Sequence, residues 1–421
     1  MRLILNKRFF IPFLSLIFFV LILASLRFRL AMPTYAYLVN DWDTVVNPGP
    51  GINVDHLNPS FHLVSLPDGN TVRRVYGVDS WVEDLIPSPS KQLGIFQGAD
   101  SAFPRSRKMI RLWDGSVQIY AFDQQLREPN VWSPDSAYLT VGIQRPCTCN
   151  LTTSYVDLGI VDVNNGHLRV LTDGEFIAQD FRSAAWSPDG TALTYVDQQF
   201  DPSMARADMV KWIAVDGSQP ARTLFTRPGV SGTWLHWLSD GEQVAVIAMA
   251  TWPEVWFINV ETAQVAFHYT SIRNFDICWS PKTDHFVVSS ESGFALITPD
   301  GLLPLDVSFV DPSIWKVTPA ADDSCAWSPD GNKLALVQSN RSSSPIVQII
   351  DFEKRSVSEI RVDHPARFLI SHWSPDSRML ALKTYRPLLE SGDTYMYDIS
   401  TMQQIYYQTH ANFLSWLPQL P

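Results

Sequence analysis

The residues with the clearest potential for chemistry are aspartates that recur within one short pattern, Trp-Ser-Pro-Asp. They are Asp135, Asp189, Asp330 and Asp376, each three residues after a tryptophan. A carboxylate can act as a general acid or base, or it can help to hold a cation. A site for one substrate needs such a group in one place, however, and these four are spread over more than half of the chain. We therefore interpret them as turn formers and not as catalytic residues.

Other residue types give no stronger signal for catalysis. The nine histidines are scattered and no HExxH motif occurs, while Cys147 and Cys149 are too closely spaced for a usual zinc knuckle. His236 and His372 each precede a repeat tryptophan, which indicates a structural role. No glycine-rich phosphate loop is present. The sequence thus predicts no catalytic residue, no metal site and no cofactor.

The turn interpretation follows from the chemistry of the pattern. In the copy at 186–190, serine can hydrogen-bond the turn backbone, proline presets φ, and aspartate and glycine suit the two positions that follow. The tryptophan then lies at the end of the strand that enters the turn. Its large flat ring can fill the wedge between neighbouring sheets at that point.

This pattern marks a repeat unit. Its tryptophans recur every 42 to 54 residues, a period typical of solenoids and propellers. Four short strand signals occupy each unit, and around Trp327 they lie at 324–327, 333–337, 345–351 and 357–362. The runs are β-branched or aromatic, and turn residues bound them. The structural tryptophans of the repeat are Trp132, Trp186, Trp237, Trp279, Trp327 and Trp373.

An all-β fold follows from this repeat: a β-propeller of four-stranded blades over residues 36–421. One sheet cannot bury both of its faces, so the sheets must stack in a ring. Eight candidates for the innermost strand, the last ending near Trp416, favour eight blades. Seven is the alternative if Trp416 only extends a neighbouring sheet. The hairpin signal at 61–76 has no turn motif before it, so we expect N- and C-terminal strands to close the ring together.

The Trp-Ser-Pro-Asp-Gly marker, followed by a hydrophobic strand and an aromatic-rich strand ending in aspartate, resembles the TolB-type or PD40 repeat, a WD40-like propeller repeat. The resemblance covers most of residues 61–418. It implies the propeller architecture and says little about function, because related repeats form both a partner-binding periplasmic protein and the gating domains of peptidases. No G-x-S-x-G nucleophile elbow is present, so peptidase activity is not carried over.

The amino terminus reads as a membrane signal. Residues 9–26 contain no charge and follow a basic start, and 18 helical residues span about 27 Å, close to a bilayer core of about 30 Å. Residues 1–35 are therefore predicted to be an uncleaved signal anchor with a single transmembrane helix. The larger basic excess before the stretch places the propeller on the extracytoplasmic side, periplasmic or extracellular. A cleaved signal, which would make the protein secreted, is the alternative.

Charge argues against nucleic acid as a partner. Residues 1–30 hold five basic and no acidic residues, which leaves 27 basic against 43 acidic residues in the rest, a formal charge of −16. Binding to a phosphate backbone needs a basic surface instead.

The segments that depart from the repeat lie between the second and third strands of each unit, and such loops often carry binding residues. We predict a protein or peptide partner, bound without catalysis. The alternative is a small-ligand binder or an enzyme of lyase or hydrolase type that uses the central channel. The candidate recognition residues are Arg145, Arg206, Trp252, Tyr385 and Arg386.

Overall fold

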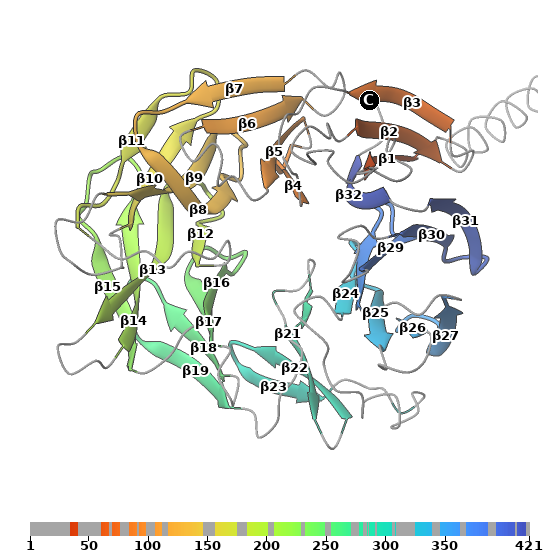
Figure 1. Cartoon of the computed structure of the whole chain (residues 1–421). Helices are drawn as coiled ribbons and strands as arrows, with labels where there is room; N and C mark the ends of the chain where they lie inside the picture. Colours follow the sequence, from red (N-terminus) through yellow and green to blue (C-terminus); the bar gives the residue numbers. More distant parts are fainter. Residues whose placement is uncertain are drawn as a thin grey trace, which may run out of the picture.

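The computed structural model arranges four-stranded antiparallel sheets in chain order around a central axis (Figure 1). Eight such sheets occur among the residues that the structure describes. We call them sheets A to H, and we call the strands of each sheet a, b, c and d from the axis outwards. The described residues are 34–40, 60–66, 70–75, 84–90, 92–97, 106–111, 117–145, 156–174, 183–200, 206–228, 232–248, 254–270, 278–280, 284, 286–290, 293–304, 308, 325–338, 346–362, 368–385, 393–408 and 411–417.

The strands of sheets A to D, each given from a to d, have the following bounds. Sheet A contains β32 (Ala411–Leu417), β1 (Thr34–Asn40), β2 (Ser60–Leu66) and β3 (Asn70–Val75). Sheet B contains β4 (Asp84–Pro87), β5 (Leu93–Gln97), β6 (Ser106–Arg111) and β7 (Val117–Ala121). Sheet C contains β8 (Gln125–Trp132), β9 (Tyr138–Gln144), β10 (Val156–Asp162) and β11 (Leu168–Val170). Sheet D contains β12 (Ala184–Trp186), β13 (Ala192–Phe200), β14 (Arg206–Ala214) and β15 (Arg222–Pro228).

Sheets E to H follow the same order. Sheet E contains β16 (Thr233–Trp237), β17 (Gln243–Ala248), β18 (Glu254–Asn259) and β19 (Val265–Thr270). Sheet F contains β20 (Cys278–Trp279), β21 (Phe286–Ser290), β22 (Gly293–Thr298) and β23 (Gly301–Pro304). Sheet G contains β24 (Cys325–Trp327), β25 (Lys333–Gln338), β26 (Ile346–Asp351) and β27 (Ser356–Arg361). Sheet H contains β28 (Phe368–Trp373), β29 (Met379–Tyr385), β30 (Thr394–Asp398) and β31 (Gln403–Gln408).

Sheet A joins the two ends of the described chain. Its strand a is β32, which pairs with β1, and the hairpin β2–β3 completes the sheet. The sequence analysis recognises the hairpin but not β1, which begins at Thr34, two residues before the expected start of the propeller at residue 36. Residues 1–33 lie outside the described residues. The described residues contain no helix that is long and apolar enough to cross a membrane.

The hydrophobic core lies between the sheets and is divided into separate clusters. Each cluster combines buried side chains of two sequence-adjacent sheets, as in the cluster of Val196 and Val210 from sheet D with Trp237 and Val246 from sheet E. Equivalent clusters join B to C, C to D, E to F, G to H and H to A. Burial between sheets therefore stabilises the arrangement of the sheets as well as each sheet.

The repeat tryptophans bond one sheet to the sheet before it. In five tryptophans of strand a, Trp416 included, the ring is buried and its indole N–H donates a hydrogen bond to a strand-a backbone carbonyl of the preceding sheet, with N···O distances of 2.9 to 3.2 Å. The sequence predicts the ring as a wedge but not the hydrogen bond. The five donor–acceptor pairs are Trp132 to Ile86, Trp186 to Val131, Trp237 to Ala185, Trp373 to Ala326 and Trp416 to His372.

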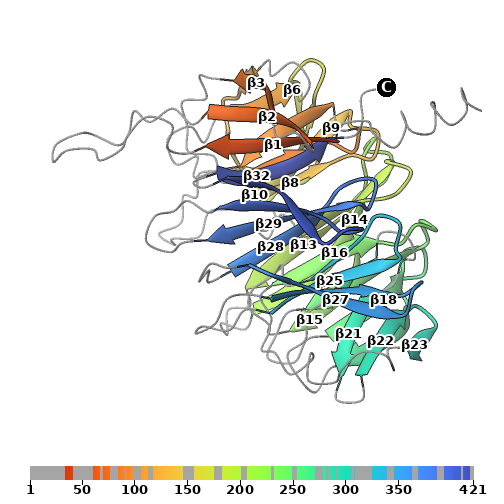
Figure 2. The same ribbon diagram turned by 90° about the vertical axis from the view of Figure 1, so that its right-hand side faces the viewer.

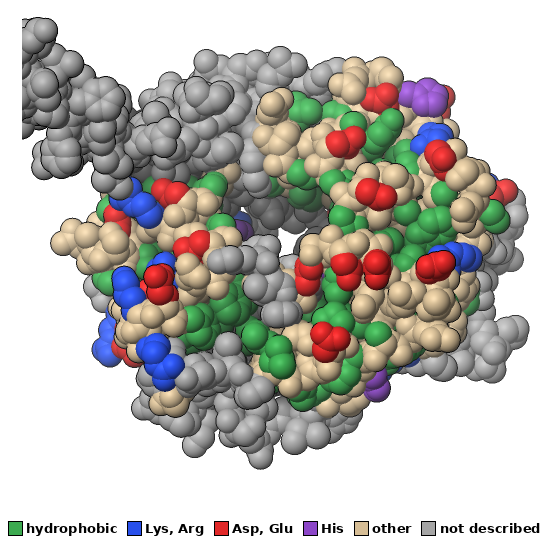
Figure 3. Space-filling model, turned by 180° about the vertical axis from the view of Figure 1, so that it is seen from behind, with side chains coloured by type: hydrophobic (Ala, Val, Ile, Leu, Met, Phe, Trp, Pro, Cys, Tyr) green, Lys and Arg blue, Asp and Glu red, His purple; other side chains and the backbone are tan. Residues whose placement is uncertain are grey.

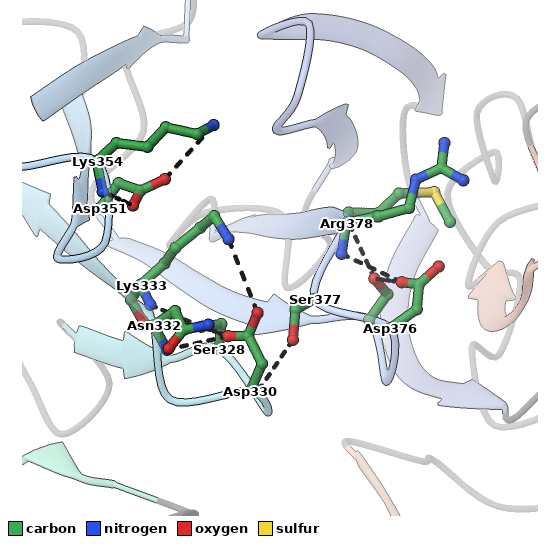
Figure 4. A network of polar contacts seen from close by, with 11 residues as sticks. Ser328, Asp330, Asn332, Lys333, Asp351, Lys354, Asp376, Ser377 and Arg378 are labelled. Carbon is green, nitrogen blue, oxygen red and sulfur yellow. Dashed lines mark hydrogen bonds and ion pairs between the residues drawn. The ribbon is translucent and has the colours of Figure 1, made fainter. Parts of the chain in front are cut away.

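The aspartates of the repeat form turns, as expected. In all four motifs the serine hydroxyl donates to the aspartate at 2.5 to 2.6 Å, and the aspartate accepts from the backbone N–H two residues on. Figure 4 shows this network in sheets G and H. The Ser187 hydroxyl and the Thr191 backbone N–H hold the pKa of Asp189 below its ordinary value.

The last position of the motif needs a left-handed backbone. Gly190 has φ +72° and Gly331 has φ +68°, but serine occupies this position in two copies, Ser136 with φ +64° and Ser377 with φ +59°. Each serine hydroxyl accepts a hydrogen bond from a turn N–H of the preceding sheet, from Ser90 and Asp330 respectively, both at 3.0 Å. These contacts between sheets offset the strain that a non-glycine residue carries there.

Replacing a repeat tryptophan separates the contribution of its hydrogen bond to stability from the contribution of its ring packing. In Trp186→Phe, the carbonyl of Val131 loses its indole donor in a partly buried position, and we expect the free energy of unfolding to fall by about 0.5–1.5 kcal/mol beyond the loss of ring area. Trp327 is the matched control, because its indole N–H is buried without a hydrogen-bond partner in the part of the chain that the structure describes. Trp327→Phe should lower the free energy of unfolding by less. Denaturant-induced unfolding measures this, and the dependence of the free energy on denaturant concentration should stay unchanged. Equal losses would contradict the role of the hydrogen bond.

A second prediction concerns pH. His236 lies in β16 with its ring edge-on to that of Phe286, at a centroid distance of 6.4 Å. Burial lowers the pKa of His236 to about 4, and Asp284 acts in the opposite direction. The unfolded chain therefore takes up the proton first as pH falls, and stability is lost between about pH 6.5 and 4. In His236→Gln, the unfolding free energy should depend less steeply on pH in this window, and an unchanged slope would contradict the assignment.

Candidate functional site

The two faces of the ring are built differently. The a–b and c–d turns lie on one face, which we call the turn face, and the b–c and d–a connections lie on the other, which we call the loop face (Figure 2). The turn face carries the repeated motif in its a–b turns. The loop face carries the irregular connections that the sequence analysis selects for binding, and strand ends form its described part.

Carboxylates recur where strand c begins at the loop face. Asp157, Asp208, Glu254 and Asp393 occupy this place in sheets C, D, E and H, and the three aspartates are at most 1% exposed. Asp208 accepts from the hydroxyl of Thr233 at 2.7 Å, which links sheet D to β16 of sheet E. A buried carboxylate is costly unless it is paired or hydrogen-bonded. These groups therefore fix the strand ends from which the b–c connections start.

Arg145 is the candidate residue that the structure describes in full. It follows β9, where its Nε pairs with the carboxylate of Asp157 and its Nη1 lies 2.6 Å from Oδ1 of Asp173. The Asp157 side chain is fully buried, the Asp173 side chain is 86% exposed, and that of Arg145 is 42% exposed. Thr172 donates to Asp157 at 3.3 Å and accepts from the Leu158 N–H at 2.8 Å. Arg145 thus holds together the loop-face ends of strands b, c and d of sheet C.

A second cationic group lies where sheets D and E meet. The guanidinium of Arg227 in β15 stacks over the ring of Trp256 at 4.9 Å and pairs with Glu254. His268 in β19 belongs to sheet E, as Trp256 does. Its ring stacks on that of Trp256 with a centroid distance of 4.9 Å and an interplanar angle of 4°, and its Nε2 lies 3.7 Å from Glu254. The arrangement packs the outer parts of two sheets together through a cation–π contact and an ion pair.

The other candidate residues are less completely placed. Arg206 is the first residue of β14 and Tyr385 is the last of β29, which puts both at the loop face, but only their backbone belongs to the described residues. Trp252 and Arg386 lie outside the described residues. Of the five candidates, the structure therefore relates only Arg145 to its neighbours, and the recognition role of all five stays a prediction.

Around the axis, His372 in β28 has an exposed side chain, and His236 in β16 packs against sheet F. No group of three or more His, Cys, Asp or Glu side chains that could hold a metal ion occurs among the described residues. The other strand-a residues that precede a repeat tryptophan are small or apolar in sheets C, D and G: Val131, Ala185 and Ala326.

Sequence reasoning missed the strand-c carboxylates and Arg227. An alignment of the repeat units on strand c, in addition to the tryptophan, would have shown an acidic residue close before or within the start of this strand at Asp157, Asp208, Glu254 and Asp393. For Arg227 the sequence offers no such signal, because its partners Trp256 and Glu254 belong to the next unit.

Replacing Arg145 separates its structural role from recognition. Arg145→Gln leaves the buried Asp157 without its guanidinium, so we expect a loss of about 1–3 kcal/mol in unfolding free energy. Arg361→Gln is the control: Arg361 pairs with Glu359 at the surface, with side chains 72% and 43% exposed, and the cost should not exceed about 1 kcal/mol.

The double variant Arg145→Gln/Asp157→Asn should recover most of the lost stability in the same denaturant melts, because no charge is then buried alone. Failure to recover would contradict the assigned pairing.

No family model matches the chain, and a search of curated proteins finds no related sequence. Solved structures, by contrast, share its architecture. The chain is similar to a eukaryotic initiation factor with 12% identity and a TM-score of 0.54, over 92% of this chain and 99% of that one. It is also similar to dipeptidyl peptidase 4 of Porphyromonas gingivalis, with 9% identity and a TM-score of 0.55, over 84% of this chain and 58% of that one.

TolB from Acinetobacter baumannii is also found, with 12% identity and a TM-score of 0.39, over 86% of this chain and 80% of that one. At such identities the first two similarities bear on the fold alone. Together with the described strands, they show an all-β chain of four-stranded antiparallel sheets of the propeller type.

Proposed function

We propose that this chain is a membrane-anchored, extracytoplasmic β-propeller that binds a protein or peptide partner through its loop face, without catalysis. The observation that carries the proposal is the contrast between the faces. On the turn face, the four complete motifs repeat one hydrogen-bonded network. On the loop face, partnered carboxylates fix the strand ends, and connections of unequal length and sequence start from them.

The arrangement of the loop face suits binding. Ion pairs and cation–π contacts hold the strand ends in place. A connection that contacts a partner therefore starts from a rigid base. Binding surfaces are often placed on loops that a rigid scaffold positions. The propeller-type fold of the structurally similar proteins also supports a binding or scaffold module.

Finer features belong to the same proposal. We infer eight blades, since β32 and β1 complete the eighth described sheet. The Trp-Ser-Pro-Asp-Gly turn supports assignment to the PD40 or TolB-type repeat. The uncharged stretch at residues 9–26 supports the anchor, and the larger basic excess before it, from Arg2, Lys7 and Arg8, supports the extracytoplasmic location.

Site-specific photo-crosslinking in the full-length, membrane-bound chain tests the face that binds. A photoreactive residue replaces exposed Thr226 or Arg361 at the loop face, or exposed Gln219 or Glu261 at the turn face as matched controls. We expect adducts from the loop-face positions only. Equal adducts from both faces, or none above a chain that carries the anchor alone, would contradict the proposal.

A further inference from the structure

The first strand enters the ring from the turn face. In the pairing of β1 with β32, Tyr35 is opposite Leu417 and Asn40 is opposite Ala411. Strand β32 runs from the loop face to the turn face, as every strand a does, and Figure 2 shows β1 and β32 running in opposite directions. Thr34 therefore lies at the turn face, and the chain that precedes it reaches the ring on that side.

The distance along the chain to the uncharged stretch is short. Residues 9–26 are followed by Arg27 and Arg29, basic residues of the kind that flank a span at the headgroups. Four residues, 30–33, separate Arg29 from Thr34, and five extended steps reach at most about 18 Å. Strand β1 itself spans about 20 Å. The connection is thus too short to run back along the sheet to the loop face.

Charge on the turn face is uneven around the ring. In sheets C, D and E its turns carry seven carboxylates, and the described basic residues near them are Arg169 and Arg222 at the starts of strands d. Figure 3 shows this face, and Asp and Glu predominate among the charged side chains over its right half. The carboxylates are Asp135, Asp162, Asp189, Asp216, Asp240, Glu242 and Glu261.

In sheets G and H, the part of the turn face on the side of sheet A carries nearly as many basic as acidic side chains. Four basic residues, Lys333, Lys354, Arg355 and Arg378, lie in or beside turns with five carboxylates, Asp330, Asp351, Glu353, Asp376 and Asp398. In sheets G and H, Lys333 lies 3.8 Å from Asp330, Lys354 lies 3.7 Å from Asp351, and Arg378 lies 3.3 Å from Asp398. Arg355 adds an exposed basic side chain in the same turn as Lys354. Figure 3 shows Lys and Arg side chains gathered on the left of the face, with Asp and Glu side chains among them. Sheet H adjoins sheet A through the hydrogen bond from Trp416 to His372.

We propose that the turn face is the membrane-facing surface of the ring, and that the ring contacts an anionic lipid surface through sheets A, G and H. The acidic half over sheets C to E, across the ring from sheet A, is repelled by anionic headgroups and tilts away from them. The loop face then points away from the bilayer. This inference rests on the proposed membrane anchor and adds the orientation in which the partner must approach.

Fluorescence quenching by headgroup-labelled lipid measures the orientation. The full-length chain, with its four native cysteines replaced, receives one labelled cysteine at Ser400 or Glu261 on the turn face, or at Arg361 or Thr226 on the loop face. Each variant is reconstituted in vesicles of phosphatidylcholine with phosphatidylglycerol. We expect the strongest quenching at position 400, weaker quenching at 261 and the least at 361 and 226. In phosphatidylcholine alone, the difference between 400 and 261 should shrink.

Flotation of the vesicles reports anchoring separately. A chain that does not float with the vesicles would overturn the anchor, and with it this inference. If the chain floats but the loop-face labels are quenched as strongly as position 400, the orientation alone is wrong. Quenching at 261 equal to that at 400 in anionic vesicles would overturn the tilt. Melting temperatures equal to that of the cysteine-free parent show that each label leaves the ring folded.

Discussion

The contact between neighbouring sheets is the constraint on which the rest of this structure depends. A four-stranded sheet of this size exposes two apolar faces, and each buried cluster is completed only by the next sheet. The indole N–H of each hydrogen-bonded tryptophan adds direction to that burial, because it selects one carbonyl on the preceding strand a. Apolar area alone would allow the sheets to slide or rotate against each other, whereas a buried donor and acceptor fix their relative position.

The same constraint explains why the two faces of the ring differ. The turn that follows each tryptophan must return the chain beside its own strand, and the serine and aspartate that achieve this are bonded within the turn. In two copies a serine with positive φ also contacts the preceding turn. The loop face carries no such repeated network in the part that the structure describes. Its strand ends are held instead by ion pairs that differ from sheet to sheet. Examples are the Arg145–Asp157 pair in sheet C and the Arg227–Glu254 pair at the junction of sheets D and E.

Much of the fold is predictable because its determinants are local. The turn motif, the strand runs and the hairpin at 61–76 are each read from a few adjacent residues, and the structure has β24 to β27 within two residues of the expected runs. Strand β1 escapes prediction because its sequence carries no repeat marker and its partner β32 lies at the other end of the chain. Arg145 could be selected as a loop residue, but its pairing with buried Asp157 depends on the register of β9 and β10.

The sequence by itself determined the four-stranded repeat and the position of its turns, and it marked the segments where the repeat rule is broken. These features depend on residue type and short spacing, which act through local backbone preference. Tertiary structure decided which carbonyl each tryptophan bonds, which charges meet between sheets, and on which face the first strand enters. Those outcomes join residues that are between about ten and several hundred positions apart, so they exist only once the sheets have packed around the axis.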